Sequence, residues 1–472
     1  MTLTMQIAKM VADVSYDDIP AHSAEKLKLL LLDQLGCMIA GSVDRESQRL
    51  RNYLEGLDAG GEAYVFGASK RMTPPNAAHA NAQSVTMLSL DDSYIRYGHP
   101  GNAFLPTVLA VGEALDAGGR DLIEAALCGY EMSMRLGLSI AATAERDQKV
   151  KGYASWQVFG ATTAAAKLHR LSADKIASAY GLTALHAPPP FLRKYHSRPL
   201  NWLKNNYGWA NKAGITSVDL AIAGYEGNRT IFDGETGYWI IAGSDQFDPE
   251  ILVTPFADRS IVEEIGFKPY SGCRWSHTSI DCVRKIMAEH AVDFAHLDRI
   301  TIETADEFVR DLNSDVWPET VLDALFNIPY LLALELHGKS SALGLSEADL
   351  TRQELAKTVG KISMSALPGA EEKFFKFSML PVRVTFFATD GRVLSEYAEY
   401  PRGHPNGPQF ARKEVVEKFF GLSTPFIGRF KAEQLCEGIL DLENRSVRDV
   451  IGIVDEHEAG TSRHPPRAAA NQ

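Results

Sequence analysis

The sequence predicts a mainly α-helical protein that consists of a large all-helical domain and a smaller α+β domain. Three observations predict this fold class. Apolar residues recur at helical spacing, in segments rich in Ala and Gly, over most of the first 260 residues. Strand-like alternation appears only later, between residues 266 and 402. The chain has 472 residues, which is more than one hydrophobic core usually supports.

The helical domain is expected to begin with residues 1–265. In residues 23–41, apolar side chains recur every three or four positions, Ser23 can cap the N-terminus and Gly41 can end the helix. The same spacing predicts further helices in residues 104–119, 121–144, 158–171, 172–187 and 209–227. The simplest architecture for these segments is a helical bundle.

Residues 266–402 have a different pattern and predict a separate α+β domain. Residues 298–305 alternate and are rich in β-branched side chains, as expected of a strand. Residues 380–400 predict a hairpin, because apolar residues alternate before Asp390-Gly391, a pair that favours a two-residue turn. Helices are expected between the strands, in residues 279–291, 322–338 and 346–362.

The C-terminal part of the chain returns to a helical pattern in residues 403–456. We expect these helices to rejoin the first domain. The remaining residues, 457–472, are polar and rich in Pro and Ala, so we expect a disordered tail.

Composition and motif content exclude several functional classes. The net charge of −12 argues against a nucleic-acid or anionic-membrane partner. Five cysteines form no C-x-x-C pair, and their odd number suits a reducing, cytoplasmic environment. The N-terminus lacks a secretory pattern, and no run of about 18 apolar residues predicts a membrane span. Nucleotide-binding and H-E-x-x-H zinc motifs are absent.

Ionisable residues crowd into residues 90–106, directly before an expected helix. Asp91 and Asp92 lie eight and seven positions before His99, and the Pro-Gly pair after the histidine indicates a loop rather than a helix. A carboxylate close to an imidazole fixes its orientation and suits an acid–base histidine. The alternative is a surface turn with solvated acids.

A second cluster, in residues 191–206, gathers basic side chains in an otherwise acidic chain. Its members are Arg193, Lys194, His196, Arg198 and Lys204. They are the best candidates for binding a carboxylate or phosphate, through a bidentate arginine or a lysine charge. A solvated basic loop is the alternative.

His277 and Tyr330 are two further candidates. His277 follows a Gly-containing irregular stretch and precedes a helix, where the helix dipole favours an anion and lowers the pKa of an imidazole. A capping or packing role is equally compatible with this position. Tyr330 follows a proline within a helical pattern and by default is a core aromatic with a bonded hydroxyl.

Together and in this order, these stretches resemble the MmgE/PrpD family, which includes 2-methylcitrate dehydratase, cis-aconitate decarboxylase and iminodisuccinate epimerase. The similarity covers nearly the whole chain. The stretches that carry it are residues 29–41, 90–115, 126–137, 203–227, 268–281 and 327–338.

The resemblance implies a cofactor-free homodimer. Its large helical domain would be made from both ends of the chain, the α+β domain would act as a lid, and the active site would lie between them. The expected ligand is a small polycarboxylate.

The resemblance also implies roles for individual residues. The implied catalytic residues are His99, Asp91, Lys204 and His277. Ser93 and Tyr330 are the implied substrate-binding residues, and we expect Asp92, Arg96 and Arg198 to join them in binding the substrate. His99 would act as base or acid, oriented by Asp91 or Asp92, and the cations would stabilise charge on the substrate. No metal ligand is expected.

The sequence departs from the family at two places. Ala154-Ser155-Trp156 stands where dehydratases and decarboxylases of the family commonly have His-Pro-Thr, and Gly101 replaces the usual small polar residue after His-Pro. The implied chemistry is proton abstraction next to a carboxylate. A 2-methylcitrate dehydratase-like hydro-lyase is expected first. The alternatives are a cis-aconitate decarboxylase-like enzyme, an iminodisuccinate epimerase-like enzyme or a non-catalytic polycarboxylate-binding protein.

Overall fold

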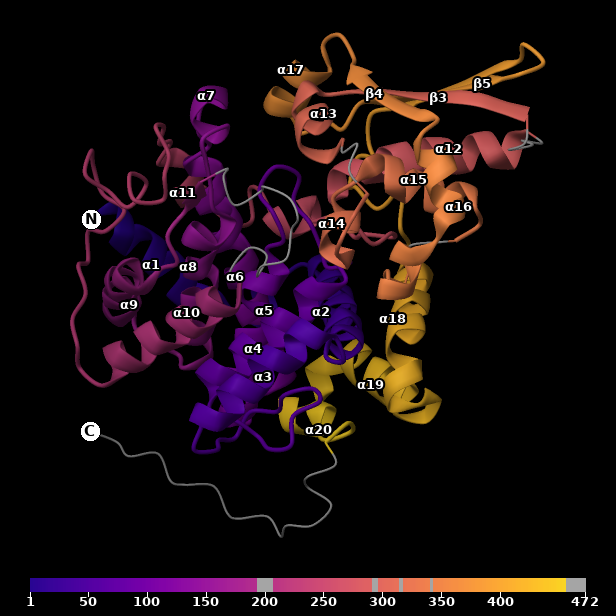
Figure 1. Cartoon of the computed structure of the whole chain (residues 1–472). Coiled ribbons are helices and arrows are strands. Elements are labelled where there is room, and N and C mark those ends of the chain that lie inside the picture. The colour runs from indigo at the N-terminus through magenta and orange to yellow at the C-terminus, as the bar shows by residue number, and fades with distance from the viewer. Residues whose placement is uncertain (193–206, 291–295, 314–316, 340–342, 456–472) are drawn as a thin grey trace.

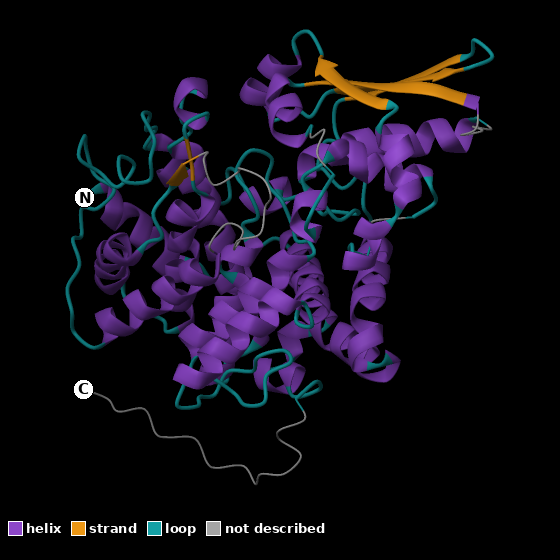
Figure 2. Cartoon of the chain, in the orientation of Figure 1, coloured by secondary structure: helices purple, strands orange, loops and turns teal. Residues whose placement is uncertain are grey.

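The computed structural model describes residues 1–192, 207–290, 296–313, 317–339 and 343–455. It is mainly α-helical, and its four-stranded sheet is confined to one end of the molecule, which confirms the predicted fold class (Figure 2). Residues 266–402, which we call the lid, lie above the helical body in Figure 1.

The first part of the chain supplies most of the helical body. Its helices are α1 (Leu3–Asp13), α2 (Ala21–Gly41), α3 (Arg45–Leu57), α4 (Pro74–Met87), α5 (Leu105–Leu115), α6 (Gly119–Ser139), α7 (Ala144–Asp147), α8 (Tyr153–Leu168), α9 (Ala173–His186), α10 (Tyr207–Ile222) and α11 (Glu250–Val253). A short antiparallel pair, β1 (Val150–Lys151) and β2 (Phe191–Leu192), lies beside them.

Helix α2 is central to the body, because every residue from Leu27 to Gly41 is buried. A side chain at Gly41 would collide with the backbone of Ser84, so glycine permits the close approach of α4. The expectation that Ser23 caps this helix is wrong. The helix begins at Ala21, and the Ser23 hydroxyl instead donates to Glu263 Oε1 at 2.8 Å.

Two other expected helices are shorter than the sequence pattern indicates. Helix α10 ends at Ile222, and Gly224 then adopts a φ of +98°, which turns the chain out of the helix. In residues 346–362, the helix is limited to α16 (Gln353–Val359) and a preceding 3₁₀ turn. The last residue of that range, Ile362, begins a strand that periodicity did not reveal.

The lid combines a mixed sheet with helices on one side. Its helices are α12 (His277–Glu289), α13 (Asp306–Leu312), α14 (Val321–Leu325), α15 (Ile328–Leu336), α16 and α17 (Ala370–Phe377). Its strands are β3 (Leu297–Thr304), β4 (Ile362–Ala366), β5 (Val382–Ala388) and β6 (Val393–Ala398). The strand order is β4-β3-β5-β6, with β3 and β4 parallel and the other pairs antiparallel.

Apolar side chains of β3 and β5 form the lid core with α12. Ile300, Val384 and Phe386 are buried in one cluster with Val283 and Ile286 of the helix. Figure 1 shows α12 and α15 below the sheet, on the side of the helical body. The β5–β6 hairpin is present, but residues 389–392 separate its strands, so the expected two-residue turn is wrong.

The last described helices return to the body beside α2. They are α18 (Arg412–Ile427), α19 (Arg429–Leu440) and α20 (Val447–Ile451). A Cβ at Gly36 would lie 3.4 Å from atoms of Phe419 and Leu422, which is ordinary packing distance. Lys418 Nζ forms a buried ion pair with Asp33 Oδ1 at 2.6 Å. The expected disordered tail, 457–472, lies outside the described residues.

A helix that spans a bilayer needs about 20 predominantly apolar residues. Within the described ranges, no helix is both long enough and apolar enough to cross a membrane.

Candidate active site

The loop between α4 and α5 makes a tight corner at His99. Arg96 has a φ of +71° and Gly98 a φ of +87°, and the backbones of Tyr94 and Gly98 pair across the turn. A Cβ at Gly98 would lie 2.8 Å from Tyr153 Cγ and from the Tyr207 hydroxyl. Glycine is therefore needed here both for its conformation and for its size.

Three groups of the described residues contact His99 at this corner, and the residue is 9% exposed. Its Nδ1 lies 2.8 Å from the carbonyl oxygen of Asp92 and 3.4 Å from Asp91 Oδ2. Its backbone N–H donates to the Tyr207 hydroxyl at 3.0 Å. Because a carbonyl oxygen can only accept, Nδ1 carries the proton in this bond, and Nε2 is the basic nitrogen.

The two aspartates of the corner have different surroundings. Asp92 Oδ2 accepts a hydrogen bond from the Tyr130 hydroxyl at 2.6 Å, and its carboxyl also accepts from the Gly101 N–H at 3.1 Å. Burial, together with the charges of Asp91 and Asp33, raises the pKa of Asp92 to about 8, although these hydrogen bonds oppose the shift. Asp92 therefore anchors the corner to α6, while the Asp91 carboxyl approaches the His99 ring.

Gly101 belongs to the same arrangement. A Cβ at this position would lie 2.6 Å from both Asp92 Oδ2 and the Tyr130 hydroxyl. Gly101 stands where the family usually has a small polar residue, and its lack of a side chain makes room for the hydrogen bond between Asp92 and Tyr130.

A second buried cluster surrounds His277, the first residue of α12. Its Nδ1 lies 3.0 Å from Arg274 Nη1, and the same guanidinium nitrogen donates to the Arg402 carbonyl at 3.0 Å. Burial, followed by the positive charges of Arg274 and Lys268, lowers the pKa of His277 well below its usual value. His277 is therefore neutral near pH 7.

The two clusters meet along residues 89–93. Ser93 and Gly266 exchange both backbone hydrogen bonds at 2.9 Å, and Lys268 Nζ donates to the Ser89 hydroxyl at 3.1 Å. A Cβ at Gly266 would lie 3.5 Å from the Ser93 carbonyl oxygen and 3.6 Å from Arg274 Nη2. The segment that orients His99 thus also borders the cations of the lid.

Several buried polar atoms at this junction lack a hydrogen-bond partner among the described residues. They are Ser93 Oγ, Arg274 Nε and Nη2, and His277 Nε2. Buried polar atoms are normally hydrogen-bonded, so these atoms retain the capacity to bind a polar ligand. Donors of this kind match the oxygen atoms of a carboxylate.

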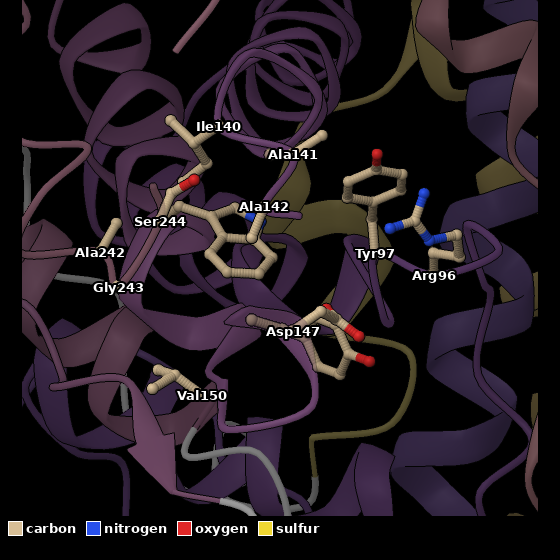
Figure 3. Close-up of a pocket in the computed structure, with 13 residues that line it drawn as sticks. Arg96, Tyr97, Ile140, Ala141, Ala142, Asp147, Val150, Ala242, Gly243 and Ser244 are labelled. Atoms are coloured by element: carbon tan, nitrogen blue, oxygen red, sulfur yellow. The ribbon is translucent and has the colours of Figure 1, made fainter. Parts of the chain in front are cut away.

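Arg96 links the corner to the lid. Its Nη1 donates to the Phe375 carbonyl of α17 at 2.7 Å, and its guanidinium lies 4.8 Å from the centre of the Phe375 ring. Arg96 also lines a pocket. Arg96 and Tyr97 lie on one side of this pocket, and Ala242 and Gly243 lie on the opposite side (Figure 3).

The structure places Tyr330 within the lid core. Its hydroxyl donates to the Asp349 carbonyl at 2.7 Å, and its ring packs edge-on against Trp317. This is the alternative considered from the sequence, a core aromatic with a bonded hydroxyl. No described contact joins Tyr330 to either histidine.

Arg198 and Lys204, with the rest of the basic cluster in residues 193–206, lie outside the described residues. The two described flanks of this gap are next to the site. Leu192 pairs with Val150, which lines the pocket, and Tyr207 binds the backbone of His99.

Sequence reasoning missed Lys268, Arg274 and Tyr130. Lys268 and Arg274 belong to the same stretch as His277, and both are buried in the structure. Two cationic residues so close to a candidate histidine could have identified them from the sequence. Tyr130 gives no such signal, because its partner Asp92 lies 38 positions away in the chain. The described residues contain no group of three or more His, Cys, Asp or Glu side chains suited to a metal ion.

Family models match the chain in two parts. The MmgE/PrpD N-terminal domain matches residues 5–250, and the MmgE/PrpD C-terminal domain matches residues 270–443. The family resemblance inferred from the sequence motifs is thereby confirmed.

Curated relatives match over nearly their full length. The cis-aconitate decarboxylase-like protein oryM of Aspergillus oryzae is 23% identical over 96% of this chain and 97% of its own. The cis-aconitate decarboxylase of Homo sapiens is 22% identical over 100% and 97%. The cis-aconitate decarboxylase of Aspergillus terreus is 24% identical over 93% of both chains.

Proposed function

The chain belongs to the MmgE/PrpD family, and we propose that it is a cofactor-independent lyase that acts on a small di- or tricarboxylate. The reaction passes through a carbanion next to a carboxylate. Relatives named cis-aconitate decarboxylase support decarboxylation of a cis-aconitate-like acid. Dehydration of a 2-methylcitrate-like acid, the reaction first expected from the sequence, is the second candidate, and epimerisation is the third.

One observation carries this proposal: an oriented histidine and a set of buried, unpartnered donors border the same short segment. Asp91 and Asp92 contact His99, while Ser93 lies beside Gly266 and Arg274 of the lid. A polycarboxylate bound at this junction would place one carboxylate against the donors and a carbon atom near the imidazole.

The cations account for the stability of the intermediate. A carbon acid is far weaker than any side chain, so a base alone does not suffice. The negative charge that develops moves onto carboxylate oxygens, where preorganised donors in a buried site stabilise it. Arg274 and Lys268 supply positive charge, and neutral His277 supplies Nε2 as a hydrogen-bond donor when its proton is on that nitrogen.

The proton steps then depend on the reaction. In decarboxylation, one carboxylate leaves as CO₂, the electron pair of the broken C–C bond remains on the substrate, and His99 donates a proton to carbon. In dehydration, His99 Nε2 removes the proton next to the carboxylate; the C–O bond to the β-hydroxyl then breaks, and the hydroxyl takes up that proton from the imidazolium and leaves as water. His99 thus acts as a general acid in decarboxylation and as a general base in dehydration.

The test is a product assay by NMR in D₂O with cis-aconitate, citrate, 2-methylcitrate and iminodisuccinate as separate substrates. We expect cis-aconitate to lose CO₂ and to gain one deuterium on carbon. Loss of water from 2-methylcitrate without CO₂ release would identify the dehydratase. Deuterium exchange with inversion of iminodisuccinate would identify the epimerase. If none of the four acids is converted, the proposed activity is wrong.

A non-catalytic, polycarboxylate-binding protein is the remaining candidate. Ala154 favours it, because this residue stands where family enzymes commonly have a histidine. The discriminating result would be a raised melting temperature with one of the acids, without any product in the same NMR assay.

A further inference from the structure

Lys418 of α18 reaches the backbone of the acid–histidine corner from the C-terminal part of the chain. Its Nζ donates to the Leu90 carbonyl oxygen at 2.6 Å, although 328 positions separate the two residues. Leu90 directly precedes Asp91 in the sequence. Figure 1 shows α18 beside α2 and below the lid. The C-terminal helices therefore contribute a hydrogen bond to the segment that orients His99.

Asp33 on α2 fixes the position of the Lys418 amine. Its Oδ1 lies 2.6 Å from Nζ, and both side chains are buried. Burial favours a neutral amine, but the charge of Asp33 and, more weakly, that of Asp91 keep the pKa of Lys418 above its usual value. Lys418 is therefore charged near pH 7, and its hydrogen bond to the Leu90 carbonyl is of the stronger, charge-assisted kind.

The lid holds the same segment from the other side. Ser89 has a φ of +49°, a conformation that a residue other than glycine keeps only where its surroundings fix it. Its hydroxyl donates to the Gly272 carbonyl at 3.2 Å and accepts from Lys268 Nζ at 3.1 Å. Adjacent residues of one turn are thus held by different parts of the molecule, Ser89 by the lid and Leu90 by Lys418 of the body.

We propose that Lys418 is a positioning residue that fixes the Leu90 peptide and thereby keeps the His99 ring oriented for proton transfer. The proposal rests on the proposed function, because it assumes that this histidine transfers the proton. A rotation of the peptide would carry the Asp91 carboxyl away from the ring nitrogen and would shift the Asp92 carbonyl that accepts its proton. A misplacement of about 1 Å can cost on the order of a hundredfold in rate.

The test removes the amine without leaving a buried charge. Lys418→Met alone would strand the Asp33 carboxylate, and breaking a buried pair in this way is strongly destabilising. Asp33→Leu/Lys418→Met replaces both charges with apolar side chains, a change that is often neutral for stability. Asp33→Asn/Lys418→Met, which keeps the shape of the acid, is the second variant. In both double variants the Leu90 carbonyl has lost its amine donor, and we expect a melting temperature above that of Lys418→Met.

Steady-state kinetics of the double variants separate positioning from a purely structural role. With the acid that the product assay identifies, kcat should fall about ten- to hundredfold, while KM stays within about twofold because the donors of the lid are unchanged. A merely structural pair would give the parent kcat once the melting temperature is restored. A folded double variant with kcat within about twofold of the parent would overturn the proposal.

A measurement on the ligand-free protein tests the proposal without any substrate. Long-range proton–nitrogen correlation spectra of histidine-labelled protein show which ring nitrogen of His99 carries the proton, and the signals missing from His99→Gln assign them. The parent should hold the proton on Nδ1. In the double variants we expect a mixture of both tautomers, because the carbonyl that accepts this proton is no longer fixed. An unchanged tautomer would also overturn the proposal.

The pair of Lys28 and Glu443 is the matched control. Lys28 is likewise buried on α2, and its Nζ likewise binds a carboxylate and a backbone carbonyl, those of Glu443 at 2.9 Å and of Leu440 at 3.0 Å. Lys28→Met/Glu443→Leu therefore removes the same kinds of contact elsewhere on the helix, and its kcat and its His99 tautomer should match those of the parent. Losses as large as in the Lys418 variants would indicate general loosening and would overturn the proposal.

The two readouts also separate this proposal from the proposed function. If none of the acids is converted but the tautomer changes in the double variants, Lys418 holds the ring and the lyase activity is wrong. If an acid is converted and kcat survives in the double variants, the positioning role of Lys418 is wrong and the lyase activity stands.

Discussion

Asp91 Oδ2 lies 3.4 Å from His99 Nδ1, and the neighbouring Asp92 contributes its carbonyl oxygen, rather than its carboxyl, to the same ring nitrogen. Two adjacent aspartates therefore have separate tasks. Asp91 supplies charge beside the imidazole, and the Asp92 carboxyl ties the loop to Tyr130. The sequence alone left open which of them orients the histidine, and the geometry assigns the electrostatic part to Asp91.

Replacement of Asp91 by Asn should lower kcat/KM about ten- to hundredfold. The change keeps the shape of the side chain but removes the negative charge that stabilises a protonated imidazole. Steady-state kinetics with the converted acid measure the effect. Asp390→Asn, in the exposed hairpin turn, is the control and should stay within twofold. An Asp91→Asn protein with more than half of the parent activity would refute the assignment.

Asp92 should give the folded protein a characteristic dependence of stability on pH. The pKa of its buried carboxyl is about 8, whereas an unfolded aspartate has a pKa of about 4. Between these values the folded state holds a proton that the unfolded state has lost, so stability falls as pH rises. The slope approaches about 1.4 kcal/mol per pH unit for one such group.

Asp92→Asn should remove this contribution and flatten the fall in unfolding free energy from pH 5 to pH 8. Urea denaturation at each pH provides the measurement. Burial raises the pKa of Glu131 to about 7, which adds a slope of the same sign to parent and variant alike. Identical slopes in the two proteins would contradict the proposed protonation of Asp92.

His277 should remain neutral across the physiological range. Burial and the charges of Arg274 and Lys268 lower its pKa well below that of an ordinary histidine. Below about pH 6.5 the unfolded histidine takes up a proton that the folded one does not, so this residue destabilises the protein as pH falls. In NMR spectra of histidine-labelled protein, the resonance missing from His277→Gln should not shift between pH 8 and pH 5. A titration with a midpoint near pH 6.5 would exclude this environment.

Loss of the Arg96 side chain should loosen the lid. Arg96→Met removes a charged hydrogen bond to Phe375, an interaction usually worth about 1.5–3 kcal/mol, and also removes the stacking on its ring. We expect hydrogen exchange in residues 370–378 to become about tenfold faster, since 1.4 kcal/mol corresponds to a factor of ten. Arg383→Met, on strand β5, should leave this segment unchanged. Unaltered exchange in Arg96→Met would show that the contact does not hold the lid.

The spacing of apolar residues in the sequence predicted those helices and strands whose formation depends mainly on neighbouring residues. The spacing of apolar residues identified α2 and α5, and alternation identified β3 and β5. Strand β4 was missed because it has only five residues and follows directly on a helical pattern; its pairing with β3 is a tertiary interaction. Ser23 was misassigned as a cap because its hydroxyl serves a contact with Glu263, 240 positions away.

The same limit applies to the candidate site. The corner at His99 could be proposed because its acids, its histidine and its Pro-Gly pair lie within one short stretch. The roles of Lys268 and Arg274 depend on the approach of Gly266 to Ser93, which no sequence spacing encodes. The sequence around Tyr330 was compatible with a substrate-binding residue and with a core aromatic residue. The hydrogen bond from its hydroxyl to the Asp349 carbonyl shows that it belongs to the lid core.

The central claim is that His99 transfers the proton at the reacting carbon. The most direct measurement is kcat/KM of His99→Gln relative to the parent protein, with melting temperatures compared to confirm folding. The account predicts a loss of about 10²–10⁴-fold, the usual contribution of a positioned acid–base group, at a melting temperature close to that of the parent. A folded variant whose kcat/KM remains within about tenfold of the parent would contradict it.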